Sequence, residues 1–291
     1  MAEAGWLHTA FGLSLAFDEA ESGELEAACA AMDAMGRQVH RRNAPQSDAL
    51  MAARGFGPGR ADLFEAAACP VQVLGELVTR AQAAGATLAR GVRVTCLGDG
   101  PEGPRVVFDD GALEADVIVL ADGWRTREID PWWVDKVHPV RVHYRRYAPL
   151  GDATAVGFSA QQGWFFGAPD PEGGLIVSGA RWASPHLEVL ETDDSGVQAN
   201  IDAALGRLVD ARLPRWAAAG LTHRWSAIAA ATCDQLPIIG PLPGRPSVVA
   251  CVGWNGRPWS LAMRAAQAVG DGLLGLPSAP IPRMFSTHRF V

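Results

Sequence analysis

The sequence predicts a mixed α/β fold in which two parts of the chain are interleaved. Helix and strand patterns alternate up to residue 125, β-rich pieces separated by Gly, Pro and Asp turns fill 126–229, and helix and strand patterns return from 230 onward. Near the C-terminus "SVVACVG" has the pattern of a buried strand, and it runs through a glycine turn into an amphipathic helix. This order indicates two interleaved parts and not two domains in tandem.

Composition limits the classes of protein that this chain can belong to. It has 291 residues, 48% hydrophobic and 20% charged, which is typical of a globular chain of one large or two modest domains. A net charge of −7 argues against a nucleic-acid partner. The N-terminus is acidic and lacks the basic region of a signal peptide, and no apolar run is long enough to cross a membrane.

Cysteine usage indicates a reducing compartment, and we expect a cytoplasmic protein. The five cysteines are scattered, odd in number and free of any CxxC pair: Cys29, Cys69, Cys96, Cys233 and Cys251. That spacing predicts neither a disulfide framework nor a zinc site. His138 and His143 are an odd number of residues apart, so on a strand they face opposite sides and share no metal. We therefore expect no metal site.

The elements before residue 126 follow from pattern and from helix-end signals. A strand is expected over 12–17, and a helix follows it with acids at its start and Arg37, His40, Arg41 and Arg42 at its end, the order that a helix dipole favours. Residues 43–62 have the composition of a loop that contains a short helix. Pro70 opens the next helix, because proline suits a first helical turn.

Strands dominate the rest of the chain. "TLARGVRVTCLG", "PRVVF" and "VIVL" each predict a strand, and the pieces from 137 to 179 predict a largely antiparallel sheet. A helix is expected before Pro214, and a strand over 221–232 follows it. Gly98, Gly100 and Gly103 form a literal GxGxxG, but a strand pattern follows it where a dinucleotide-binding motif needs a helix. We therefore interpret "GDGPEG" as a hairpin turn.

The C-terminal third carries an ordered set of short motifs. Trp225 stands near a small residue, then comes a Thr-Asp-Leu-Pro-Ile-Gly pattern in "TCDQLPIIG", then a strand, and then Gly-Trp-Asn-Gly-Arg at 253–257 before a helix. This order resembles the FAD-dependent oxidoreductases of the D-amino-acid oxidase superfamily, above all members similar to glycine/sarcosine oxidase and gamma-glutamylputrescine oxidase. Earlier pieces resemble the same family, so the resemblance covers nearly the whole chain.

The resemblance implies a division of the chain and a cofactor. It implies an incomplete FAD-binding Rossmann-like domain over 70–125 and 230–291, interleaved with a mostly antiparallel β substrate domain over 1–69 and 126–229. The last helix would point its N-terminus at the pyrimidine end of the flavin, where negative charge develops on reduction. The residues that would contact FAD are Val94, Ala121, Gly123, Gly253, Trp254, Asn255, Gly256 and Arg257.

The family chemistry implied is oxidation of an amine or amino acid, with hydride transfer from the carbon bearing nitrogen to flavin N5 and hydrolysis of the imine. No side-chain base is required, and we assign no catalytic residue. The substrate would lie against the β-rich part, with Tyr144, Arg181 and Trp225 as its binding residues and Arg181 as a carboxylate partner. Arg181 could equally be a surface arginine. Tyr144 and Arg146 share one face of their strand, and Arg145 lies on the other.

The family's first strand–GxGxxG–helix unit has no counterpart in these residues. Three explanations stay open: a second polypeptide supplies the unit, the true start lies upstream, or the protein has lost FAD. A sheet without this unit would expose an unpaired strand edge, so we also expect a hetero-oligomer or self-association. The leading hypothesis is an enzyme, and the alternative is a non-catalytic flavoprotein-fold subunit.

Overall fold

The computed structural model describes residues 7–9, 12–37, 39–62, 66–151, 156–277 and 280–291. The chain divides into two compact units. Unit 1 comprises Met1–Leu88, Val142–Glu188 and Asp194–Ala227, and unit 2 comprises Ala89–Arg141, Val189–Asp193 and Ile228–Val291. The described structure is mixed α/β, as the sequence predicts. What each part binds is not decided by this division, so the assignment of a flavin-type and a substrate-type domain remains a prediction.

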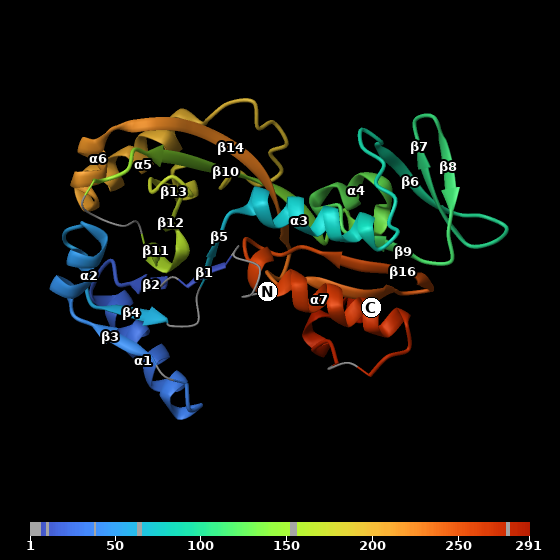
Figure 1. Ribbon diagram of the computed structural model, residues 1–291, viewed down its shortest axis with the longest axis horizontal. Coiled ribbons are helices and arrows are strands. Elements are labelled where there is room, and N and C mark those ends of the chain that lie inside the picture. The colour runs from blue at the N-terminus through green and yellow to red at the C-terminus, as the bar shows by residue number, and fades with distance from the viewer. Residues whose placement is uncertain (1–6, 10–11, 38, 63–65, 152–155, 278–279) are drawn as a thin grey trace. The chain divides into compact units, whose positions relative to one another are not determined.

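An eight-stranded sheet organises unit 1, with β14 and β10 side by side at one edge (Figure 1). Among the pairs whose register is described, β11 and β2 are parallel and the others antiparallel. The order is β14 (Leu221–Thr232), β10 (Val137–Tyr147), β13 (Leu175–Gly179), β12 (Phe165–Pro169), β11 (Gly157–Ala160), β2 (Gly12–Leu15), β4 (Gly59–Asp62) and β3 (His40–Arg42). β14 and β10 each continue into unit 2.

The two faces of this sheet differ in chemistry. One face packs against α5 (Ala199–Arg212) and α6 (Pro214–Ala219) around a core that includes Leu15, Phe165 and Trp216. The opposite face carries a row of more polar residues. They are directly opposed from strand to strand, and side chains at opposed positions point to the same face of a sheet. That row runs Tyr144, Ser178, Phe166, Ser159, Ser14, Arg60 and Arg41.

The remaining elements of unit 1 begin where the sequence provides caps. α1 (Glu19–Ala34) starts at Asp18, whose carboxylate accepts from the Glu21 N–H, and α2 (Ala44–Met51) starts with a capping box made by Asn43 and Gln46. α3 (Pro70–Ala83) opens on the expected proline. β1 (Leu7–Thr9) and β5 (Ala66–Ala68) form a separate two-stranded sheet.

The carboxylate of Glu21 fastens a distant turn to the start of α1. It accepts hydrogen bonds from the N–H groups of Phe17 (2.7 Å), Gln161 (3.1 Å) and Gln162 (2.7 Å). Gln161 and Gln162 both have left-handed backbones, with φ of 54° and 53°. Non-glycine residues hold this conformation only where the surroundings support it, and here a charged acceptor provides that support.

The basic segment after α1 corrects one expectation. His40, Arg41 and Arg42 were expected at the end of the helix, but they form edge strand β3. α1 ends at Ala34 with no basic residue in its last turn, because Gly36 adopts φ 72° and turns the chain away. A run of basic residues after a predicted helix is therefore not evidence that the helix continues.

Unit 2 contains two three-stranded sheets. β15 (Ile238–Leu242), β16 (Arg245–Val252) and β9 (Ile118–Leu120) form one, and β6 (Val94–Asp99), β7 (Pro104–Phe108) and β8 (Gly111–Glu114) form the other. α4 (Thr126–Ile129) and α7 (Pro258–Leu273) are its α-helices among the described residues. The main apolar cluster includes Trp133, Ile238 and Val252. The prediction of a hairpin at "GDGPEG" is confirmed, since β6 and β7 pair across it and the Gly100 N–H donates to the Gly103 carbonyl at 2.8 Å.

All five cysteines are free thiols. None of the helices in the described ranges is both long enough and apolar enough to cross a bilayer.

Candidate functional site

Two loops of unit 2 follow neighbouring strands of the same sheet. β9 and β16 are parallel, with Ala250 opposite Leu120. Their carboxyl ends therefore emerge side by side, and they lead into Ala121–Gly123 and Gly253–Arg257 respectively. Ligands of open α/β sheets bind at the carboxyl ends of parallel strands, so these loops form a candidate cofactor site.

The turn from Gly253 to Arg257 is held by one amide side chain. The Asn255 Oδ1 atom accepts from the Thr232 N–H at 2.8 Å, and its Nδ2 atom donates to the Thr232 Oγ1 atom at 3.0 Å and to the Gly253 carbonyl at 2.6 Å. Gly253, Asn255 and Gly256 all have left-handed φ values, of 77°, 51° and 79°. Glycine and asparagine are the residues that adopt this region most readily, which explains their order in the sequence.

The N-terminus of α7 is open to an electron-rich group. No side chain caps it, its first turn contains no acid, and Pro258 lies in that turn. α1, α2 and α5 are capped by the side chains of Asp18, Asn43 and Gln198, whereas α3 and α6, like α7, have no side-chain cap. A Cβ atom at Gly256 would meet no atom within 4 Å. An uncapped helix end with free space beside it fits a group that gains negative charge, as a reduced flavin does.

The other predicted cofactor residues have distinct positions around this edge. Ala121 is exposed directly after β9, and Gly123 follows with φ 67°. Trp254 is half-buried against Ile239, Cys251 and Ala265, and Arg257 is the exposed N-cap residue of α7. Val94 begins β6 in the other sheet of unit 2 and packs against the main apolar cluster. Contact of these residues with a flavin remains a prediction.

Asp122 lies between two of the predicted cofactor residues and titrates unusually. Loss of hydration raises the pKa of its carboxyl to about 6, with Glu128 adding to the rise and Arg125 opposing it. The residue as a whole remains exposed, so solvent screening keeps the linked free energy small. Asp122 therefore favours its neutral form near the candidate site more than an ordinary aspartate does.

We expect the protonation of Asp122 to affect how the stability of the protein depends on pH. Between the ordinary pKa of 3.8 and about 6 the folded protein binds more protons at Asp122 than the unfolded chain does. Stability from this group is therefore present at low pH and is lost as the pH rises through 6. We expect Asp122→Asn to be more stable than wild type at neutral pH and to lose this slope in thermal melts from pH 4 to 7. Parallel pH profiles for the two proteins would contradict the assignment.

A stacked aromatic pair lies on the polar-row face of the unit 1 sheet. The rings of Tyr144 on β10 and Trp225 on β14 are 5.2 Å apart at their centroids and 11° from parallel. Burial raises the pKa of the Tyr144 phenol above its ordinary value, so the ring stays neutral. Trp225 is 36% exposed and forms one wall of a cavity of about 560 Å³. The structure thus brings together two of the three predicted substrate residues.

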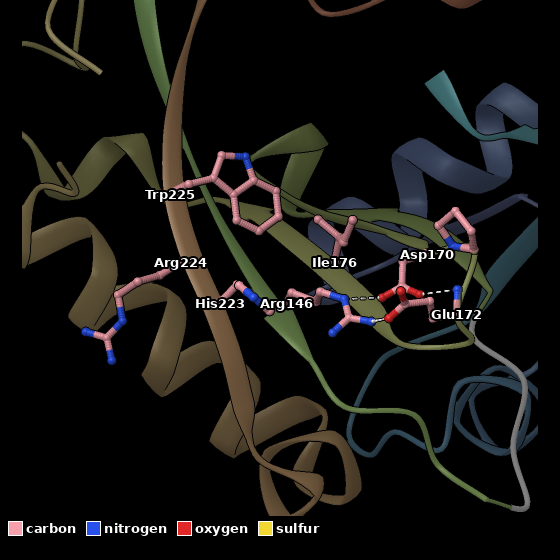
Figure 2. A pocket seen from close by; sticks show the side chains of 8 residues that line it. Arg146, Asp170, Glu172, Ile176, His223, Arg224 and Trp225 are labelled. Carbon is pink, nitrogen blue, oxygen red and sulfur yellow. Dashed lines mark hydrogen bonds and ion pairs between the residues drawn. The ribbon is translucent and has the colours of Figure 1, made fainter. Parts of the chain in front are cut away.

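Figure 2 shows this cavity with Trp225 and His223 on β14 and an ion-pair network beside Ile176. The guanidinium of Arg146 donates three hydrogen bonds. Its Nε atom donates to the carboxylate of Asp170 and its Nη1 atom to the hydroxyl of Thr222. Its Nη2 atom donates to the carboxylate of Glu172 at 2.6 Å. Arg145 points to the other face and pairs with Asp202 at 2.7 Å. The predicted alternation of the two arginines is confirmed. The charge of Arg146 is already neutralised, which makes it a poor anchor for an anionic substrate.

The third predicted substrate residue has different neighbours. Arg181 follows β13, donates to the Leu187 carbonyl at 3.0 Å and lies over the Trp164 ring, 5.3 Å from its centroid. Burial lowers the pKa of its guanidinium, and Glu188 partly offsets that effect. Whether Arg181 binds a carboxylate remains a prediction.

Sequence reasoning missed the acids of this cavity. Asp170 lies in the turn between β12 and β13 and is only 8% exposed. Its carboxylate also accepts from the N–H groups of Glu172 and Gly174. A turn of the type Asp-Pro-Glu-Gly-Gly signals only a local bend, and nothing in its sequence shows that Arg146 lies opposite. Among the described residues, no group of three His, Cys, Asp or Glu side chains could hold a metal ion.

A match to a family model defines the class of this protein as an FAD-dependent oxidoreductase. The family of FAD dependent oxidoreductases (DAO) matches residues 2–271, and the chain belongs to that family. FAD is the cofactor of the family, and the resemblance noted in the sequence is confirmed. A search among curated proteins gave no match.

Several solved structures share the fold of this chain. Glycine oxidase from Geobacillus kaustophilus is 18% identical with a TM-score of 0.86, covering 100% of this chain and 78% of that one. L-proline dehydrogenase from P. horikoshii is 14% identical with a TM-score of 0.85, covering 99% and 79%. L-amino acid deaminase from Proteus vulgaris is 18% identical with a TM-score of 0.76, covering 98% and 73%. At these identities the similarity establishes the fold.

Proposed function

We propose that this protein oxidises an amine or an amino acid at the carbon that bears the nitrogen, with FAD as the hydride acceptor. The observation that carries the proposal is the turn from Gly253 to Arg257, which opens an uncapped helix beside Ala121–Gly123. The names of the similar structures, an oxidase, a dehydrogenase and a deaminase of amino acids, support this substrate class.

The residues of the chain would divide the work between cofactor and substrate. FAD, when bound, supplies the acceptor for the hydride. The first N–H groups of α7 would stabilise negative charge, and Gly256 leaves room for a close approach of the backbone. Tyr144 and Trp225 offer a neutral aromatic wall for the carbon skeleton of the substrate. Arg181, held by the Leu187 carbonyl, would meet a substrate carboxylate.

We also propose that the phosphate-binding unit of the FAD site is supplied by a second polypeptide or by an N-terminal segment that these residues do not include. Within the described residues β9 pairs with β16 alone, so its other edge is open. Val119 in β9 is 44% exposed, so one face of this strand is uncovered as well. An added strand that precedes a GxGxxG turn would cover this edge and bring the motif to the carboxyl ends of β9 and β16.

The test is the visible spectrum of the purified protein with excess FAD, alone and with a co-expressed neighbouring product that contains the GxGxxG unit. A yellow protein that is bleached anaerobically by an amine or amino acid supports the proposal. Colour in the complex but not in the chain alone supports the second polypeptide. A protein that stays colourless in both states would overturn the enzyme and leave the alternative, a flavoprotein-fold subunit that does not bind FAD.

Trp225 provides a test of the substrate wall. We expect Trp225→Ala to slow flavin reduction at low substrate concentration by about tenfold. The reason is that the substrate loses its contact with the indole ring, worth about 1.4 kcal/mol. FAD content should not change, because the substitution lies in unit 1 outside the predicted cofactor loops. Stopped-flow absorbance measures the rate, with Trp182→Ala, another exposed tryptophan of unit 1, as the control. Equal rates for the two variants would exclude Trp225 from the substrate site.

A further inference from the structure

The C-terminal segment, residues 280–291, packs against the sheet of unit 2 that leads into the predicted cofactor turn. Ser286 pairs with Ile239 of β15 in a parallel bridge. The hydroxyl of Thr287, a buried residue, donates to the Pro241 carbonyl. These contacts fix the C-terminal segment in place beside β15.

The guanidinium of Arg289 binds the loop between β14 and β15 at three places. Its Nε and Nη2 atoms donate to the two carboxylate oxygens of Asp234, at 2.6 and 3.0 Å. Its Nη1 atom donates to the Pro237 carbonyl at 3.1 Å, and Nη2 also donates to the Leu236 carbonyl at 2.9 Å. The side chain of Arg289 is 13% exposed, so these bonds are largely shielded from water.

The pair of Arg289 and Asp234 is charged and directional. Burial alone would raise the pKa of the Asp234 carboxyl, but the hydrogen bonds from Arg289 and from the Leu236 N–H hold it below its ordinary value. That N–H donates to the Oδ1 atom of Asp234 at 3.1 Å. A bidentate arginine–carboxylate pair fixes the relative orientation of its two partners. The loop is therefore held in one orientation on the C-terminal segment.

Leu236 connects this loop to the predicted cofactor turn. Its carbonyl accepts from Arg289 and also from the Thr232 hydroxyl, at 2.9 Å in each case. The Thr232 hydroxyl accepts from the Asn255 Nδ2 atom at 3.0 Å, and the Thr232 N–H donates to the Asn255 Oδ1 atom at 2.8 Å. Asn255 in turn holds Gly253–Arg257. An unbroken series of hydrogen bonds therefore runs from Arg289 to the turn.

The C-terminal segment also restrains the turn through apolar contacts. Ile281 and Phe285 pack against the small apolar cluster that contains Cys251 and Ala265. Trp254, in the middle of the turn, packs against the same cluster. Both routes, one polar and one apolar, therefore end at the turn.

We infer that Arg289 is a positioning residue for the cofactor site, because it holds the loop through which Thr232 and Asn255 keep the turn at the start of α7 in place. Donors that are already aligned need no reorganisation when negative charge develops beside them. The inference rests on the proposed function for the identity of the bound group. The coupling between Arg289 and the turn does not depend on that identity.

Hydrogen–deuterium exchange of the full chain, measured by mass spectrometry, tests this coupling without FAD. The N–H groups of Thr232 and Arg257 are both hydrogen-bonded in and around the turn, so peptides that contain them report on it. We expect Arg289→Met to speed exchange there at least about tenfold and to leave β12 of unit 1 unchanged. Arg283→Met, which removes an exposed arginine of the same segment, is the control. Wild-type exchange at the turn in Arg289→Met overturns the inference.

Thr232 variants show whether the effect follows the hydrogen bonds. Thr232→Val removes the hydroxyl that joins Leu236 to Asn255 and should speed exchange at Arg257. Adding Arg289→Met should then have no further effect, since the link through which Arg289 acts is already broken. Thr232→Ser keeps the hydroxyl and should restore slow exchange. Fully additive effects of Thr232→Val and Arg289→Met would mean that Arg289 acts elsewhere and would overturn the inference. Arg289→Lys keeps the charge but not the fork, and it replaces Arg289→Met if that variant fails to fold.

Titration with FAD, followed by flavin fluorescence, separates this inference from the proposed function. It uses the chain together with the co-expressed product where the chain alone does not bind. We expect Arg289→Met to raise the Kd for FAD about tenfold and Arg283→Met to leave it unchanged. The same Kd in wild type and Arg289→Met overturns the role of Arg289 toward the cofactor. A wild type that binds no FAD overturns the proposed function instead, and exchange alone then decides whether Arg289 holds the turn.

Discussion

Replacing Asp170 with alanine is expected to lower the free energy of unfolding by about 3 kcal/mol. The side chain of Asp170 is 4% exposed and that of its partner Arg146 is 17% exposed, so the substitution leaves a largely buried guanidinium without its nearest acid. It also removes the acceptor of the Glu172 and Gly174 N–H groups. Thermal and urea unfolding, followed by far-ultraviolet circular dichroism, measure the change.

Glu172→Ala is the matched control, because it removes the other acid that pairs with the same arginine. Glu172 is 79% exposed, and exposed ion pairs contribute about 0–1 kcal/mol. Asp170→Ala should therefore be the more destabilising by at least about 2 kcal/mol. If the two variants melt together, the network is a surface feature and does not shape the wall of the cavity.

Gly253→Ala is expected to destabilise the protein by about 3 kcal/mol. A Cβ atom at this position would lie 2.3 Å from the Cγ2 atom of Thr232, and the residue would have to keep φ 77°. Thr232 cannot rotate away freely, since its hydroxyl donates to the Leu236 carbonyl at 2.9 Å and also bonds Asn255. The left-handed backbone costs about 1 kcal/mol and the overlap about 1–3 kcal/mol more.

Two controls separate these costs. Gly256→Ala has a similar φ of 79° but open space around the added carbon, so we expect a loss of only about 1 kcal/mol. The double variant Gly253→Ala with Thr232→Ser removes the clashing methyl group and keeps the hydroxyl, and it should regain most of the difference. The same variants titrated with FAD would show whether the turn contributes to the cofactor site. Equal losses at Gly253 and Gly256 would refute the steric argument.

Elements with strong local signals could be predicted from the sequence. Pro70 marked the start of α3, and the proline and glycine pattern at 98–104 marked the β6–β7 hairpin. The alternation of Arg145 and Arg146 followed from the period of a strand and needed no tertiary information. The turn at Gly253 was likewise predictable, because left-handed positions restrict the residue type.

Features set by distant contacts could not be predicted in this way. β3 is a strand because residues 40–42 pair with residues 59–61, and Gly36 had already ended the helix. The hydrogen bond of Arg146 on β10 to Asp170 depends on the turn between β12 and β13. In chain order, β11 and β12 lie between these two residues. In the candidate site the stacking of Tyr144 on Trp225 joins two strands that are far apart in sequence. The pattern predicted both strands and the face of Tyr144, but not this contact.

The parallel pairing of β2 with β11 has a consequence for the order of folding. β2, β4 and β3 can pair with one another as soon as residues 12–62 have left the ribosome, since all three strands lie within this stretch. β2 must then wait for Gly157–Ala160, and Glu21 for the backbone of Gln161 and Gln162, before the sheet closes. During synthesis the N-terminal segment therefore presents an unpaired strand edge for roughly a hundred residues of elongation, several seconds at the usual rate.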